Sequence, residues 1–353
     1  MKSTPSKARG LTVAMLAIVL IAGGCAGGIP TVKPEPVPEE PPPALVASQT
    51  ERILSELGQE IAAQGEAGPA GGAGRMAGPA LAMREAEYIY ARAEEEAAKD
   101  KGEEPNPAAS VVPMGTTFAG VIVPATDTWP RSFVAVTEPV DAQAPLLYVL
   151  TQENALSQYK LTMWVRLIAK TAVPAMAPAE KGAAQLPIER VDTLAIAPVA
   201  ALEAYAAVKE DPIAPVPMPF SQEDPVRAGW YQHIDGWGTA LADIKGTVEH
   251  SSTANLQGAV ALETADGGAL VFGTISSQLD LSFKRSSAGE FFELPERMAA
   301  LGDGTTKVTK RAVVDFQQTV ALVIPPVGST APIEVIGAFQ VPIKVTVTQE
   351  EKS

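Results

Sequence analysis

Apolar residues recur at helical spacing in two segments that follow residue 47. The first segment begins with Ser48 and Glu51, which have the i, i+3 spacing of a capping box. Its apolar face is formed by Ile53, Leu57 and Ile61. The second segment begins at Pro79, a residue favoured in a first helical turn, and continues to the charged residues 94–96. The pattern therefore predicts two helices before any strand.

From Thr116 onward the apolar spacing changes from helical to alternating. Apolar, β-favouring stretches lie at residues 117–123, 132–137, 146–151 and 159–168. The last stretch alternates most regularly, and one of its faces is formed by Tyr159, Leu161, Met163, Val165 and Leu167. Such alternation is typical of an antiparallel sheet with one face against a core.

A second set of helices is predicted after residues 171–190, which are rich in proline and alanine and lack a period. We expect a loop and a domain boundary there. A short helix is predicted from Pro198, and a longer one from Asp224 and Pro225, an N-cap followed by a first-turn proline. The longer helix carries one continuous apolar face, formed by Trp230, Ile234, Trp237, Leu241 and Ile244. This face must be buried, and a sheet is the expected partner.

Five further strands are predicted in the last hundred residues, at 258–264, 268–274, 277–284, 312–324 and 333–347. The first two flank Asp266-Gly267, a hairpin turn signal. His250 falls in a stretch of Glu, Ser and Thr that we interpret as a loop. Pro342 has no N–H for a ladder hydrogen bond, so it marks an edge or a bulge in the last strand.

This order of elements predicts an α+β fold of two domains, residues 48–190 and 191–350, each with helices packed on a curved antiparallel sheet. Helices followed by a meander of strands are similar to the cone-like nuclear-transport-factor-2-like and cystatin-like folds. The likeness concerns the fold and leaves the function open.

The N-terminus has the pattern of a secretory signal. Lys2, Lys7 and Arg9 precede an apolar stretch at 11–22, which at about 1.5 Å per residue is too short for a bilayer core of roughly 30 Å. Cys25 follows Ala22-Gly23-Gly24, which resembles a bacterial lipobox. We therefore predict a signal peptide at 1–24 that is cleaved after Gly24, and a lipidated Cys25. The alternative is ordinary cleavage beside an unmodified cysteine.

A lipidated Cys25 would place the mature protein on the extracytoplasmic face of the cell membrane, anchored by its N-terminal lipid. Residues 25–47 include a proline-rich stretch, which we interpret as a linker with polyproline II character. Generic disorder would serve equally well as a tether.

Composition excludes several classes of protein. The 353 residues are 46% hydrophobic, which is too apolar for a disordered chain, and 41 acidic residues against 27 basic ones give a net charge of −14. A basic nucleic-acid-binding surface is therefore disfavoured. Two histidines and one cysteine cannot build disulfide scaffolds, Cys/His zinc sites or iron–sulfur sites. We predict no metal and no cofactor.

Several stretches resemble a group of actinobacterial lipoproteins of unassigned function. They are residues 75–81 together with Arg84 and Tyr88, and residues 123–131, 145–147, 264–271 and 323–326. The likeness covers nearly all of the chain after the linker, and the motifs are structural in kind. The resemblance implies a secreted, lipid-anchored α+β protein, and it carries over no catalytic residue.

Three common enzymatic motifs are not found: the chain has no G-x-S-x-G, G-x-x-x-x-G-K-[ST] or H-E-x-x-H. The best candidate pocket surrounds Trp230, His233 and Trp237, where a cone-like sheet would open. At 100° per residue, Asp235 lies on another flank of that helix than His233, so the two do not form an acid–base pair.

Two functional hypotheses follow. The first is a non-catalytic envelope lipoprotein that binds a protein or another component of the cell envelope. The alternative is a small-molecule-binding protein or enzyme that uses the pocket near Trp230, His233 and Trp237. An open cavity of several hundred cubic ångströms with converging polar side chains would favour the alternative.

Overall fold

The structure is a computed structural model of the chain, and it describes residues 41–65, 68–69, 74–106, 111–141, 143–221, 224–284 and 290–350. The predicted signal peptide, Gly24, Cys25 and most of the predicted linker lie outside the described residues. The part that follows residue 39 forms one compact unit. Within the described residues, no helix combines the length and the apolar character needed to cross a membrane.

Four strands of the first half form an antiparallel meander, as the alternation predicted. They are β1 (Phe118–Ile122), β3 (Arg131–Thr137), β4 (Leu146–Gln152) and β5 (Lys160–Leu167). β4 is buried along almost its whole length, because helices cover one of its faces and the remainder of the sheet covers the other. The predicted bounds of these strands are confirmed to within one or two residues.

Four longer strands of the second half lie side by side. They are β7 (Thr247–Glu263), β8 (Ala269–Ser282), β11 (Arg311–Ile324) and β12 (Glu334–Thr348), in the spatial order β12-β11-β8-β7. The hairpin at Asp266-Gly267 is confirmed, and Pro342 lies at a bulge where the β11–β12 register shifts. The separate strands expected at 268–274 and 277–284 are one strand, β8. His250 lies on β7, so its assignment to a loop was wrong.

A single mixed sheet joins both halves. Within the described residues its order is β1-β3-β4-β5-β12-β11-β8-β7-β6-β2. The short strands are β2 (Pro124–Ala125) and β6 (Ala183–Leu186), and β6 lies in the segment expected to be a loop. Because β2 follows β1 after one residue and pairs with β6, the sheet nearly closes on itself around an apolar interior.

The join between the halves is short and tightly packed. Gly337 and Ala338 of β12 pair with Leu167 and Arg166 of β5. A Cβ atom at Gly337 would lie 2.8 Å from Cγ2 of Val165, so a side chain there would clash with the neighbouring strand. The two strands approach closely at this point because residue 337 is a glycine.

The structure confirms the α+β class with a curved, mostly antiparallel sheet, and it does not confirm the division into two domains. The expected boundary at 190/191 falls inside one compact unit, and the sheet continues across it through the β5–β12 and β6–β7 pairs. Local periodicity identifies strands but carries no information on pairs this far apart in sequence, such as Leu167 with Gly337.

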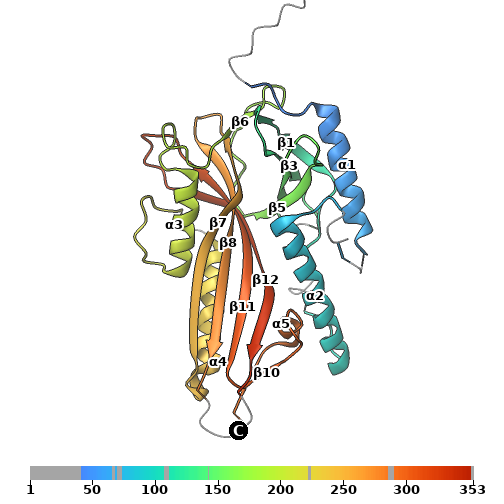
Figure 1. Cartoon of the computed structure of the whole chain (residues 1–353), viewed down its shortest axis with the longest axis vertical. Coiled ribbons are helices and arrows are strands. Elements are labelled where there is room, and N and C mark those ends of the chain that lie inside the picture. The colour runs from blue at the N-terminus through green and yellow to red at the C-terminus, as the bar shows by residue number, and fades with distance from the viewer. Residues whose placement is uncertain are drawn as a thin grey trace, which may run out of the picture. The chain divides into compact units, whose positions relative to one another are not determined.

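The helices cover the outer faces of the sheet (Figure 1). α1 (Ala47–Ala63) and α2 (Gly78–Lys101) lie over the β3–β5 meander, and α3 (Pro198–Glu210) lies over β7 and β8. α4 (Pro225–Leu241), η3 (Ala242–Ile244) and α5 (Glu296–Ala299) lie at the other end of the long strands. β9 (Phe292–Glu293) and β10 (Lys307–Val308) form a small separate pair beside them.

Helix starts were predicted with mixed success. α2 and α3 begin with proline in the first turn, and the Asp224 carboxylate accepts hydrogen bonds from the N–H groups of Val226 and Arg227 at the start of α4. The capping box at Ser48 was wrong. Val46 is the N-cap of α1, and its N–H donates to Oε1 of Gln49, so the cap begins two residues earlier. Gln49 has the same i, i+3 relation to Val46 as Glu51 has to Ser48.

Candidate functional site

α4 carries His233 and Trp237 beside the apolar face that packs on the sheet. Trp230 and Leu241 are fully buried against the long strands. His233 and Trp237, one turn apart, are half-buried at the edge of this contact. His233 and Trp237 therefore lie at the margin of the contact between α4 and the sheet, where solvent can reach them.

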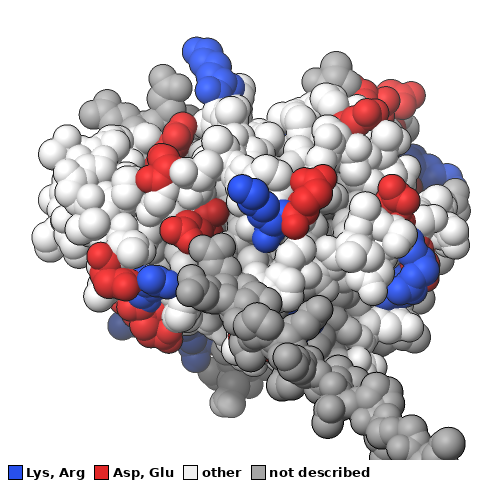
Figure 2. All heavy atoms as spheres, turned by 90° about the horizontal axis from the view of Figure 1, so that it is seen from above, with Lys and Arg blue, Asp and Glu red and all other residues white. Residues whose placement is uncertain are grey.

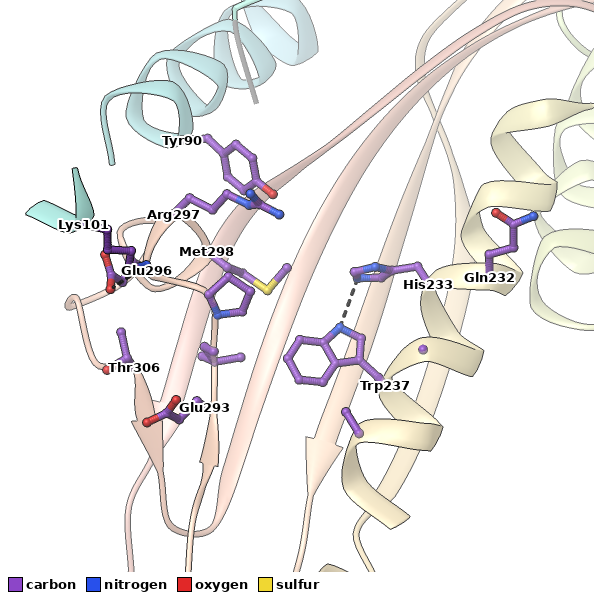
Figure 3. A pocket seen from close by; sticks show the side chains of 14 residues that line it. Tyr90, Lys101, Gln232, His233, Trp237, Glu293, Glu296, Arg297, Met298 and Thr306 are labelled. Atoms are coloured by element: carbon purple, nitrogen blue, oxygen red, sulfur yellow. Dashed lines mark hydrogen bonds and ion pairs between the residues drawn. The ribbon is translucent and has the colours of Figure 1, made fainter. Parts of the chain in front are cut away.

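An open cavity of about 730 Å³ lies next to these two residues (Figure 3). Its walls come from α4, from the C-terminal half of α2, and from β9, α5 and β10. The side chains that line it are Tyr90, Lys101, Gln232, His233, Trp237, Ala240, Glu293, Leu294, Pro295, Glu296, Arg297, Met298 and Thr306. We call this cavity the α4–α5 pocket. Its volume is in the range of pockets that bind small molecules.

His233 is a neutral imidazole in this pocket. The indole Nε1–H of Trp237 donates to Nε2 of His233 at 3.3 Å, and the two rings are perpendicular. Burial lowers the pKa of His233, because the cationic form is poorly solvated there. With Nε2 acting as an acceptor, the proton of the neutral ring is on Nδ1. The ring can therefore donate one hydrogen bond from Nδ1.

The opposite wall carries paired charges. Nη1 of Arg297 donates to Oε2 of Glu94 at 2.9 Å, and the guanidinium lies 5.3 Å from the ring centre of Tyr90. The hydrogen bond from Arg297 is the main cause that lowers the pKa of Glu94. Lys101 and Glu296 form a more exposed ion pair, with an N···O distance of 3.5 Å. Each cation therefore has a carboxylate neighbour.

Arg297 retains hydrogen-bonding capacity. Its side chain is 29% exposed, and it has guanidinium N–H groups besides the one that donates to Glu94; the Nε atom is buried and does not face the cavity. Figure 3 shows the guanidinium and the imidazole of His233 extending toward one another from opposite walls. The pocket thus combines an aromatic surface at Trp237 with N–H donors on two sides. Such an arrangement suits a ligand with an apolar face and oxygen acceptors.

The three residues predicted for a pocket are separated by the structure. His233 and Trp237 line the α4–α5 pocket, whereas Trp230 lies beneath α4 with 1% of its surface exposed. The Trp230 ring contacts Phe316 and His250 edge to face and does not line the cavity. Its position four residues before Ile234, on the centre of the apolar face, explains its burial.

Several pocket residues were missed by sequence reasoning. Arg297 and Tyr90 lie 207 residues apart and meet only in the folded chain. Glu94 belongs to the run of charged residues near the end of α2, and it pairs with Arg297 of α5, 203 residues later in the chain. No local pattern distinguishes Arg297 from other surface arginines, so the sequence contains no signal that would have selected it.

A second polar cluster lies under α3 and α4. Nζ of Lys209, which is fully buried, donates to Oγ of Ser277 at 2.7 Å and to Oε1 of Gln340. Nearby, the Tyr205 hydroxyl donates to Oδ2 of Asp224 at 2.7 Å. Burial lowers the pKa of Lys209 to about 7, and the charge of Asp224 opposes that change. Since Lys209 lines none of the described pockets, we assign this cluster to packing.

Metal-ligand geometry is not found in the part of the chain that the structure describes. No three His, Cys, Asp or Glu side chains there gather closely enough to hold an ion.

The profile of one protein family matches residues 72–341, which is most of the chain. The chain belongs to this family. Its description is "domain of unknown function" (DUF8094), so membership assigns no activity. The matched range includes the α4–α5 pocket and also residues 190 and 191, where a domain boundary was expected. No curated protein and no solved structure matches the chain.

Proposed function

We propose that the DUF8094 protein is a lipid-anchored protein of the cell envelope that binds a ligand without transforming it, and that the α4–α5 pocket is the binding site. The anchor rests on the signal pattern that ends at Cys25. The binding role rests on one observation: Trp237 and His233 face Arg297 across an open cavity of about 730 Å³.

Binding without catalysis is supported by the chemistry of the lining. His233 is held by an indole N–H and not by a carboxylate, so no group is positioned to strengthen it as a base. Among the described residues that line the pocket there is no cysteine or serine, and Thr306 and Tyr90 carry the hydroxyl groups. An activated nucleophile needs an adjacent base, which this lining does not supply.

The first hypothesis from the sequence, binding of a protein or another envelope component, remains part of this proposal. The pocket favours an occupant of small-molecule size, such as one unit of an envelope polymer. The actinobacterial lipoprotein group, and the finer view of the fold as two nuclear-transport-factor-2-like cones, stay predictions that rest on sequence resemblance.

The position of the pocket suits a tethered protein. The described chain begins at Pro41, near β2, where the N–H of Ala44 donates to the carbonyl of Pro124. α4 and α5, which line the pocket, lie at the other end of the long strands (Figure 1). Figure 2 shows the end near β2, where acidic and basic side chains are interspersed among neutral ones. An anchor at Cys25 is joined to the described chain at Pro41, which is at this end.

The anchor has a direct test. Cells that express the chain are grown with radiolabelled palmitate, and we expect label on the wild type and none on Cys25→Ser. The wild type should also sediment with membranes and be released by detergent. An unlabelled wild-type protein, or equal labelling of both, would refute the anchor and leave the pocket untouched.

The pocket is tested with Trp237→Ala. We expect one class among peptidoglycan fragments, neutral oligosaccharides and glycerophospholipids to raise the melting temperature of the wild type, and to bind Trp237→Ala at least about tenfold more weakly, because the aromatic face is lost. Leu156→Lys, at a fully exposed turn, is the matched control. If all three proteins respond alike, or none responds, the pocket is not the site.

A further inference from the structure

We propose that the groove between α1 and β1 binds an extended peptide, which adds to the sheet as a new strand beside β1. This groove has a volume of about 540 Å³ and is distinct from the α4–α5 pocket. One wall is α1 and the other is the segment 116–121. The proposal is independent of the function proposed above.

β1 is a terminal strand of the sheet. On one side it pairs with β3, through Phe118 with Thr137 and Gly120 with Val136. On its other side, no described residue exchanges a main-chain hydrogen bond with residues 118–121. The register of β1 with β3 shifts between Phe118 and Gly120, which marks a bulge there. From Gly120 onward the free edge offers N–H and C=O groups at β spacing, and an extended peptide backbone complements them.

The helix wall runs along this edge. The α1 residues that line the groove are Ala47, Thr50, Glu51, Leu54 and Ser55, which are spaced at three and four and so form one helical face. Two approaches mark the ends of the groove: a Cβ atom added at Gly58 of α1 would lie 3.4 Å from Cβ of Thr116, and before α1 the N–H of Ala44 donates to the carbonyl of Pro124 in β2. The groove is therefore bounded along its length by a helix and a strand edge.

The floor of the groove has room for side chains of a bound peptide. Gly120 is exposed, and a Cβ atom added there would meet no atom within 4 Å, so the groove is deepest where residue 120 has no side chain. Leu54, Phe118 and Val121 supply apolar surface on either side. A bound strand would direct alternate side chains toward this surface, which selects apolar residues at every second position.

Charge specifies the peptide further. Glu51 is the one charged residue of the groove lining, and it is exposed. The chain as a whole carries a net charge of −14. A basic side chain near Glu51 is therefore favoured over an acidic one. The inferred ligand is an extended peptide segment with alternating apolar residues and at least one lysine or arginine.

The test begins with a display library of random decapeptides, selected on the full chain. The most enriched peptide is synthesised and its affinity is measured by titration calorimetry. We expect alternating apolar and basic residues in it. We also expect amide hydrogen exchange at residues 118–122 to slow at least about tenfold when it binds, because strand addition protects these groups. N-methylation of alternate peptide amides should abolish binding, whereas methylation of the others should not.

Two variants and one control complete the test. Gly120→Phe places a large side chain in the groove, and the backbone at residue 120 does not have the positive φ that would require glycine. We expect this variant to bind the peptide at least about tenfold more weakly and to keep the wild-type melting temperature. Glu51→Lys should lower the affinity for a basic peptide several-fold. This second variant keeps the test informative if Gly120→Phe fails to fold. Leu156→Lys, far from the groove in sequence and fully exposed, should bind like the wild type.

Three results would overturn the proposal. One is the absence of any enriched peptide. Another is a peptide that binds both groove variants as it binds the wild type, or that protects amides elsewhere. The last is self-association that both groove variants abolish without any peptide, since this would assign the edge of β1 to a second copy of the chain.

Discussion

Replacing Arg84 with methionine is expected to lower the free energy of unfolding by about 3–5 kcal/mol, because the buried carboxylate of Glu87 would lose its cation. Nη1 of Arg84 donates to Oε2 of Glu87 at 3.1 Å, and the two side chains are 5% and 4% exposed. Arg84 also donates to Gln64 and to the carbonyl of Val112, which ties α2 to the segment before β1.

The stability that Arg84→Met loses should depend on pH. Burial raises the pKa of Glu87 to about 7, and Arg84 opposes this change. Since the folded-state pKa is above that of the unfolded chain, the folded state binds more protons between about pH 4.5 and 7, and this group's contribution to stability falls as pH rises through that window. Without Arg84 the pKa rises further. Urea denaturation should therefore show a larger loss at pH 8 than at pH 5.

Two control variants test whether the buried charge of Glu87, and not a general disturbance of packing, causes the loss of stability. Arg311→Met breaks an exposed ion pair with Asp280, and it should destabilise the protein far less than Arg84→Met does. The double variant Arg84→Met, Glu87→Leu removes both charges and should recover much of the loss. A loss that is the same at pH 5 and pH 8, with no recovery in the double variant, would show that the carboxylate is not its cause.

Lys209 should make the protein more stable as pH rises from about 7 to 10.5. Burial lowers the pKa of Lys209 to about 7 in the folded state, from 10.5. Between these values the unfolded chain binds more protons, so the free energy of unfolding increases with pH. The difference in pKa corresponds to an upper limit of about 5 kcal/mol. Below pH 7 both states are protonated and the full penalty for the buried cation remains.

The measurement is a series of urea denaturation curves between pH 6 and 10. Lys209→Met should remove most of the pH dependence, because an uncharged side chain has no proton to exchange. Its absolute stability also reflects Ser277 and Gln340, which lose their donor. Lys344→Met, at an exposed position of β12, is the control and should retain the wild-type slope. An identical slope in Lys209→Met would contradict the assignment.

The bounds of β4 and β5 were predictable from the sequence, because both strands are rich in bulky apolar residues. The single apolar face expected on β5 was wrong: its register with β4 shifts at Leu150, so Leu161 and Trp164 join one apolar cluster and Met163 and Val165 join another. The first half of β7 was missed. Its less exposed positions carry Val248, His250, Ser252 and Ala254, and this mixture of small and polar residues hides the alternation. Ser252 can face inward because its hydroxyl meets that of Ser277 at 2.9 Å.

Only the α4 wall of the α4–α5 pocket was predictable from the sequence. The expected opening of a cone-like sheet suggested a pocket near His233 and Trp237, and both line the α4–α5 pocket. The helical period had placed Trp237 on the buried apolar face, whereas it is half-buried. Trp230 was assigned to the same pocket although only 1% of its surface is exposed. Arg297, which completes the site, comes from a one-turn helix whose position depends on packing against α2.

The amino-acid sequence by itself determined the α+β class, the capped start of α4 at Asp224, the hairpin at Asp266-Gly267 and the buried face of α1. These features depend on neighbours within a few residues, where backbone geometry sets a period of 3.6 or 2. Only the tertiary structure decided that one nearly closed sheet joins both halves, and that Arg297 faces His233. Such contacts link segments distant in the chain, and they are selected by the packing free energy of the whole fold.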